Sequence, residues 1–170
     1  VGTLSVFGEK LEFDLQNNRL PLFTTKFVSF KNVLVELIWF IKGSCSLNYL
    51  HENKCKIWDD NVKAKGQLGP MYPMQWRRCG VRYIHDDVDA LEGGIDQLSN
   101  MKKLIKEDPH SRRIIINNYD VVNLDKMCLN PCHVLFQVNV TGENNELLEG
   151  IFYMRSSDVI LGLPYNVCSY

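Results

Sequence analysis

The feature that most constrains this chain is a cysteine at the start of two strand-like segments. Pro131 ends one element, Cys132 follows at once, and apolar residues alternate over 134–139 as in a largely buried strand. The run 142–145, Gly-Glu-Asn-Asn, predicts a hairpin turn before a second strand over 147–153. A thiol placed there has a fixed backbone and is open to a substrate. The alternative reading is a small buried hydrophobe, the usual state of an intracellular cysteine.

The second predicted strand leads into a cluster of hydrogen-bonding side chains, Arg155-Ser156-Ser157-Asp158. A guanidinium near a thiol favours the thiolate, which is the nucleophilic form. Cys132 and Arg155 together therefore suggest a nucleophilic site. His133 follows Cys132 directly, but neighbours on a strand face opposite sides. We expect His133 to orient or pack rather than to act as the base for Cys132.

Composition excludes several classes of protein. At 170 residues the chain is most simply one domain, 1–170, and its formal charge of -1 with scattered basic residues predicts no nucleic-acid partner. Its longest apolar run, around 37–41, is too short to span a membrane. The six cysteines include no Cys-x-x-Cys pair. We therefore expect reduced thiols, no metal, and a cytoplasmic protein, with a nuclear setting as the alternative.

Helix and strand patterns are interspersed without strict alternation, which favours an α+β fold. Helices are predicted over 28–42, 47–53 and 96–107, strands over 4–15 (broken by Gly8) and 113–119, a turn at Asn17-Asn18, and mainly loop over 59–89.

Glu36 lies within the most apolar predicted helix, between Val35 and Leu37. A carboxylate buried there without a partner would cost several kcal/mol. Burial raises a carboxyl pKa, which makes acid–base work feasible near neutral pH. The alternative is a narrow solvent-facing stripe of this helix.

Several motifs occur together in a fixed order. They are Glu36-Leu37-Ile38-Trp39-Phe40, Ile57-Trp58-Asp59, Gly69-Pro70-Met71-Tyr72 with Gln75-Trp76-Arg77, Ser111-Arg112-Arg113-Ile114-Ile115, Pro131-Cys132-His133, Arg155-Ser156-Ser157-Asp158 and Leu161-Gly162-Leu163-Pro164-Tyr165-Asn166. In order and spacing, over effectively the whole chain, this set closely resembles the thymidylate synthase family.

The resemblance implies a large twisted mixed β-sheet flanked by helices, with two sheets packed back to back in a homodimer. It implies reductive methylation of deoxyuridylate (dUMP) to thymidylate (dTMP), through a covalent adduct of Cys132 at C6 of the base. The implied co-substrate is 5,10-methylenetetrahydrofolate, and no metal is implied.

The resemblance also assigns roles to residues. Those implied in catalysis are Cys132, Glu36, Tyr72 and Arg155. Those implied in dUMP binding are Arg112 and Arg113 from the partner subunit, and Arg155, Ser156, Asp158, Asn166 and His133. Those implied in folate binding are Trp58, Asp158, Leu129 and Lys26. Asn166 is the implied reader of uracil, since an amide offers both a donor and acceptors.

Two alternatives stay open. Deoxycytidylate hydroxymethylase chemistry is the nearest, and Asn166 argues against it because that branch of the family carries aspartate there. A non-catalytic nucleotide-binding or dimerising remnant is the other. The chain departs from the family at Met154, where glutamine is usual, and at Pro73, where glycine is common. It opens at Val1, beyond the family's N-terminal phosphate arginine, and we expect it to be part of a longer protein.

Overall fold

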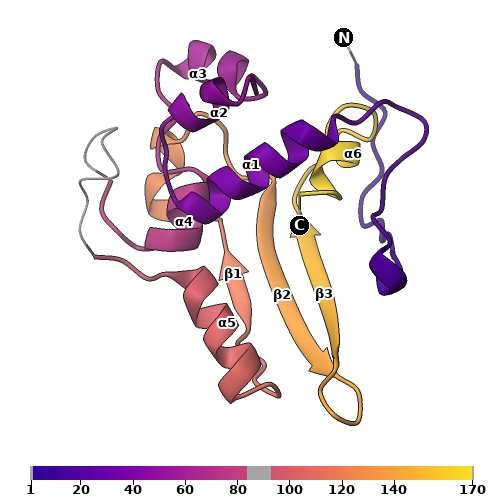
Figure 1. Ribbon diagram of the computed structural model, residues 1–170. Helices are drawn as coiled ribbons and strands as arrows, with labels where there is room; N and C mark the ends of the chain where they lie inside the picture. Colours follow the sequence, from indigo (N-terminus) through magenta and orange to yellow (C-terminus); the bar gives the residue numbers. More distant parts are fainter. Residues whose placement is uncertain (1, 84–92, 170) are drawn as a thin grey trace.

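The computed structural model describes residues 2–83 and 93–169, which form helices around a small antiparallel sheet (Figure 1). The helices are α1 (Phe30–Lys42), α2 (Asn48–Glu52), α3 (Asp59–Lys65), α4 (Tyr72–Arg78), α5 (Gln97–Glu107) and α6 (Leu163–Asn166), with 3-10 turns η1 (Gln16–Asn18) and η3 (Val121–Lys126). The strands are β1 (Ile115–Asn117), β2 (His133–Thr141) and β3 (Leu147–Met154). This mixture confirms the α+β class.

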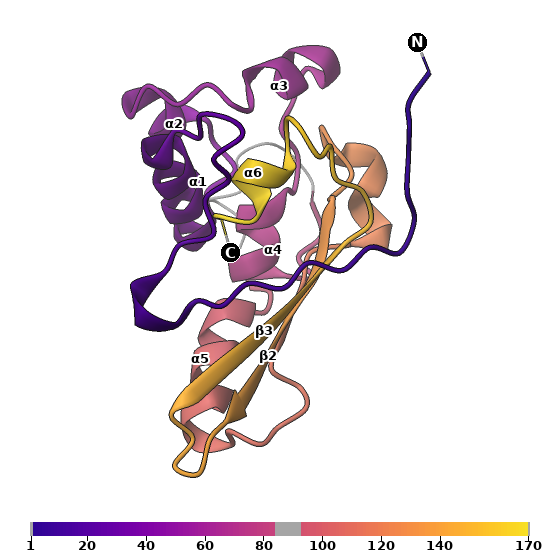
Figure 2. The ribbon, with the colours of Figure 1, turned by 90° about the vertical axis from the view of Figure 1, so that its right-hand side faces the viewer.

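The three strands pair in the order β1-β2-β3, and both pairs are antiparallel. The predicted hairpin joins β2 to β3, with Gly142 at φ +91° in its turn. Val138 and Val140 of β2 pack with side chains of α5, which covers one face of the sheet (Figures 1 and 2). In the described residues the sheet is thus small and antiparallel, and the expected large mixed sheet is not seen there.

The main core lies between α1 and the elements packed on it. Helix α1 begins after Ser29, whose Oγ accepts from Asn32 N, and ends at Gly43 with φ +75°. Trp39 and Phe40 are fully buried, and the Phe40 ring lies 5.2 Å from the ring of Tyr72 on α4. The predicted helices over 28–42, 47–53 and 96–107 are therefore confirmed, with ends shifted by one or two residues.

The prediction of mainly loop over 59–89 is wrong where two helices form. Residues 59–65 and 72–78 form α3 and α4, and 84–89 lie outside the described residues. Pro73 misled the prediction, because proline breaks a helix interior but is tolerated in the first turn, where its missing N–H has no partner to lose. It occupies that turn of α4, which buries residues 72–76.

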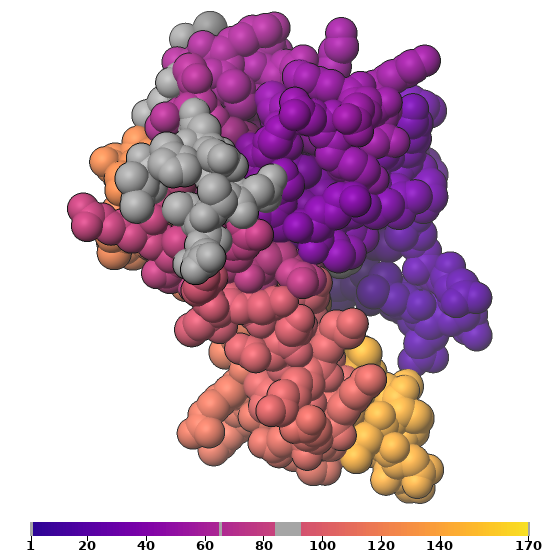
Figure 3. All heavy atoms as spheres, turned by 60° about the vertical axis from the view of Figure 1, so that its left-hand side comes forward, coloured from indigo at the N-terminus to yellow at the C-terminus, as the bar shows by residue number. Residues whose placement is uncertain are grey.

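The N-terminal strand prediction is also wrong. Residues 4–15 form no strand, and they are exposed on the β3 side of the molecule (Figure 2). A strand is stabilised by pairing, and none of the described strands pairs with this segment. The turn at Asn17-Asn18 is confirmed, with both residues at positive φ, and this part stands out from the rest of the surface (Figure 3). Strand β1 covers only 115–117 of the predicted 113–119.

Within the described residues, every helix falls short of the length and apolar character that crossing a bilayer requires.

Candidate active site

Cys132 sits at the entrance of β2 and is fixed by a tyrosine hydroxyl. Its backbone N–H donates to Tyr72 Oη at 2.9 Å, and the N–H of His133 reaches the same oxygen at 3.4 Å. The thiol is free and partly exposed, whereas Tyr72 is 2% exposed. Burial raises the pKa of the Tyr72 phenol, so this hydroxyl is neutral over the physiological range. Tyr72 thus joins α4 to the start of β2.

Arg155 follows the last residue of β3 and contacts the backbone around Cys132. Its Nε donates to Pro131 O at 2.9 Å and its Nη2 to Asn130 O at 2.6 Å. The Nη2 atom also lies 3.8 Å from Cys132 Sγ, and Arg155 N donates to Cys132 O at 3.0 Å. The guanidinium is oriented by two carbonyls and placed beside the thiol. The structure therefore brings together the two residues that the sequence paired.

His133 is buried among aromatic rings. It is 4% exposed, and its ring lies 5.1 Å from the Tyr72 ring and 4.9 Å from the ring of Phe152. Burial lowers its pKa to about 3, so the imidazole is neutral at pH 7. The register of β2 and β3 shifts between His133 and Leu135. His133 therefore packs against Tyr72 and Phe152.

Glu36 is held at both carboxylate oxygens. Trp58 Nε1 donates to Oε1 at 2.8 Å, and Ser169 Oγ lies 3.2 Å from Oε2. Burial raises the pKa of Glu36 to about 7, and the two hydrogen bonds oppose that rise. The carboxyl can therefore give or take a proton near neutral pH. Sequence analysis missed Ser169, whose one signal is its place three residues after Asn166, about one helical turn.

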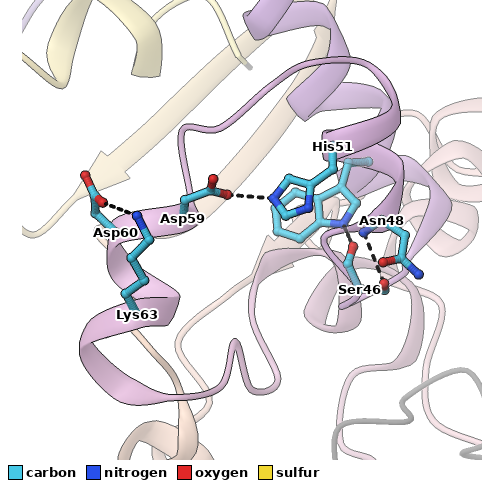
Figure 4. Close-up of polar contacts among 7 residues, drawn as sticks. Ser46, Asn48, His51, Asp59, Asp60 and Lys63 are labelled. Atoms are coloured by element: carbon cyan, nitrogen blue, oxygen red, sulfur yellow. Dashed lines mark hydrogen bonds and ion pairs between the residues drawn. The ribbon is translucent and has the colours of Figure 1, made fainter.

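Trp58 is positioned by the contact of two short helices. It precedes α3, and its ring packs 5.8 Å from Trp39 and 6.0 Å from Tyr72. His51 of α2 bonds through Nε2 to Asp59 Oδ1 at 2.7 Å, which ties the first residue of α3 to α2 (Figure 4). Because Asp59 follows Trp58 directly, this tie restrains the indole that reaches Glu36.

Asn166 ends α6 and lies close to Gly162. A Cβ at Gly162 would come 3.1 Å from Asn166 Oδ1, so the glycine leaves room for the amide oxygen. Asp158 fixes the turn before α6, because its Oδ1 accepts from the N–H groups of Ile160 and Leu161. Its Oδ2 bonds to no other described residue and is exposed, which leaves one carboxylate oxygen for a ligand.

Some of the remaining predicted site residues lie near the residues described above, and others lie far from them. Lys26 Nζ lies 5.8 Å from the centroid of the Tyr165 ring on α6, Leu129 packs on the core, and Ser156 is exposed. Arg112 and Arg113 are exposed in the turn before β1 rather than in the strand. Ile115 pairs with Gln137 of β2, which lies five residues after Cys132 in the chain. At about 3.3 Å per residue, both arginines lie well away from Cys132 of the same chain.

Over residues 2–83 and 93–169, no three His, Cys, Asp or Glu side chains gather as a metal site would require.

Comparison with known proteins identifies the family. The sequence profile of the thymidylate synthase family matches residues 1–170. The chain is 45% identical over 170 residues to thymidylate synthase of Buchnera aphidicola subsp. Schizaphis graminum (strain Sg). It is 42% identical over 169 residues to thymidylate synthase of Buchnera aphidicola subsp. Acyrthosiphon pisum (strain APS). Each alignment covers 99% of this chain and 60% of the relative.

The chain therefore belongs to the thymidylate synthase family, as the motifs of the sequence indicated. It spans about 60% of the length of the curated relatives that it matches.

The raised pKa of Glu36 predicts a specific pH dependence of stability. The carboxyl binds its proton more tightly in the folded chain (pKa about 7) than at its ordinary value of 4.5. Its contribution to stability is therefore fully present below pH 4.5 and is lost as the pH rises towards 7. Between pH 5 and pH 8 the wild type should lose about 2–3 kcal/mol of unfolding free energy relative to Glu36→Gln. Urea titrations of both proteins measure this difference, and parallel pH profiles would contradict it.

Proposed function

We propose that this protein carries out thymidylate synthesis, the reductive methylation of dUMP to dTMP. The observation that supports it best is the corner at Cys132, where a partly exposed thiol lies 3.8 Å from the anchored guanidinium of Arg155. Cys132 Sγ would form a bond to C6 of the base, and the electron pair of the C5–C6 double bond would move towards C5 and O4. This turns an inert ring carbon into a nucleophile.

The folate site is proposed from the residues around α6 and Trp58. Asp158 Oδ2 is available for a donor of the pterin, and Lys26 lies near α6. Trp58 belongs to the main core, and Leu129 packs against it. These side chains suit an extended molecule with an aromatic head and an anionic tail. When bound, 5,10-methylenetetrahydrofolate would supply the carbon and the hydride of the new methyl group.

Proton transfer would divide between Glu36 and Tyr72. The C5 proton must leave the base before the methyl group is complete. Glu36, with a pKa of about 7, would transfer protons at the pyrimidine carbonyl and would order the water molecule bound there. The Tyr72 hydroxyl already accepts from Cys132 N and stays protonated, so it would support proton removal by holding Cys132 and its surroundings in place.

The proposed homodimer rests on two features. Arg112 and Arg113 are exposed and far along the sheet from Cys132, so they suit the nucleotide phosphate of a partner subunit. The face of the sheet opposite α5 exposes apolar side chains of β3, with Ile151 at 68% and Tyr153 at 56%. An apolar sheet face of this kind is typical of an interface. Arg155 and Ser156 would bind the phosphate within the same subunit.

The first test is Cys132→Ser in the protein made from its natural gene. Turnover should fall by several orders of magnitude while dUMP binding persists, because a hydroxyl is far harder to ionise than a thiol. A denaturing gel of the complex with 5-fluorodeoxyuridylate and folate measures the covalent adduct. The matched control is Cys128→Ser, whose thiol lies in the core, and it should keep the adduct. A covalent band that survives in Cys132→Ser would contradict the proposal.

A mixing experiment tests the shared site. Neither Arg113→Ala nor Cys132→Ser subunits should be active alone. Mixed dimers should recover part of the activity, because one of their two sites then holds both intact residues. Subunit exchange is checked by mass spectrometry of tagged subunits, and absence of recovery after full exchange would place Arg113 outside the partner's site.

Substrate choice tests the role of Asn166. In Asn166→Asp, preference for dUMP over deoxycytidylate should fall by about one to two orders of magnitude. A carboxylate only accepts, so O4 of uracil loses its donor, at a cost of about 1–3 kcal/mol. The ratio of kcat/KM for the two nucleotides measures this change. An unchanged ratio would mean that Asn166 does not read the base.

A further inference from the structure

The two oxygens of Glu36 have partners of different chemical kinds. Trp58 Nε1–H donates to Oε1 at 2.8 Å, and an indole can only donate. Oε1 must therefore accept in both protonation states of the carboxyl. Because a carbonyl oxygen accepts better than a protonated one, this contact favours the proton of Glu36 on Oε2, the oxygen that faces Ser169 Oγ at 3.2 Å.

Ser169 differs from Trp58 because a hydroxyl both donates and accepts. Its Oγ lies 2.9 Å from Tyr165 O as well as 3.2 Å from Glu36 Oε2. The hydroxyl has one proton for these two acceptors. When Glu36 is ionised, Ser169 can donate to Oε2. When Glu36 is protonated, Oε2–H can donate to Ser169, whose own proton then goes to Tyr165 O.

We infer that Ser169 is a positioning residue that reverses its hydrogen bond with Glu36 whenever the carboxyl gains or loses its proton. Ser169 is 1% exposed, so bulk water does not replace it. It follows α6, and its N–H reaches Asn166 O at 3.3 Å. The reversal lets both forms of Glu36 keep one geometry relative to Asn166. Only the catalytic use of Glu36 rests on the proposed function; the reversal itself does not.

Two titratable groups that interact with Glu36 are Cys55 and Tyr72. Burial raises the pKa of Cys55, next to α2, and that of Tyr72 on α4, and the charge of Glu36 acts on both. Both stay neutral near pH 7. Lys31 of α1 and Asp59 of α3 also act on Cys55, and Lys26 lies over the Tyr165 ring at α6. Burial raises the pKa of Glu36 to about 7.

The indole of Trp58 reports the state of Glu36 directly. The chain has three tryptophans, so a 15N-indole-labelled sample gives few signals, and Trp58→Phe assigns the one that matters. In the wild type this signal should shift with a midpoint near pH 7. In Ser169→Ala both forms lose a partner, but the carboxylate loses the stronger, charge-assisted hydrogen bond, so the midpoint should rise by about one pH unit.

Matched variants separate the effect of the Ser169 hydroxyl from the effect of side-chain shape. Ser169→Thr and Ser169→Val have the same shape, and only the threonine should keep a midpoint near that of the wild type. Cys168→Ala is the neighbouring control, because Cys168 is also buried but its thiol contacts Pro21 O instead of Glu36. Its midpoint should not move.

The outcomes separate this inference from the proposed function. The titration needs neither nucleotide nor folate, so a protein without thymidylate activity would still give the predicted midpoints. A midpoint that is unchanged or lowered in Ser169→Ala, or equal in Ser169→Thr and Ser169→Val, would overturn the inference. In an active protein the pH profile of kcat should also shift upward in Ser169→Ala, whereas a purely structural role would lower kcat at all pH values alike.

Discussion

The pairing of β2 with β3 is the interaction on which the candidate site depends. His133 lies opposite Met154, and the next bond along the chain runs from Arg155 N to Cys132 O. A slip of β3 by one residue would turn every side chain of that strand to the other face of the sheet. Arg155 would then lose Pro131 O and Asn130 O, and with them its place beside the thiol. The turn at 142–145 sets this register from the far end of the sheet.

A buried carboxyl gives the site its second constraint. Glu36 could not stay ionised in an apolar core without partners, and the core supplies them from two distant segments. Trp58 comes from the edge of α3, and Ser169 from the end of α6. These contacts join three parts of the chain that share no local pattern. The two hydrogen bonds to Glu36 lower its pKa by less than burial raises it. The pKa therefore stays near 7 instead of falling to the value of an exposed carboxyl.

Local signals in the sequence were sufficient for the elements that stabilise themselves. Helix α1 has an apolar period, a capping serine and a terminal glycine, and the hairpin has its turn residues. Prediction failed where distant contacts decide the outcome. The apolar residues over 4–15 matched a strand but have no paired strand among the described residues, and Pro73 concealed a helix that the core requires. Helix α4 is buried over five residues. The positions of proline and glycine alone could not reveal this burial.

The residues of the candidate site divide in the same way, into those that local patterns predict and those that distant contacts bring together. Cys132 and Arg155 could be paired from sequence because each lies at the end of a strand in one hairpin. The contact of Tyr72 with Cys132 spans 60 positions, and that of Ser169 with Glu36 spans 133. No periodicity encodes contacts of that range, so the resemblance to a family supplied Tyr72, and Ser169 was missed.

Tyr72 shows why such contacts matter for chemistry. Its oxygen receives N–H groups from Cys132 and His133, while its ring packs against His133, Phe40 and Trp58. A phenolate would receive the same two hydrogen bonds, yet burial outweighs them and raises the pKa. The hydroxyl therefore keeps its proton at neutral pH. The backbone of Cys132 is thus fixed by a neutral group, and the guanidinium of Arg155 lies beside the thiol.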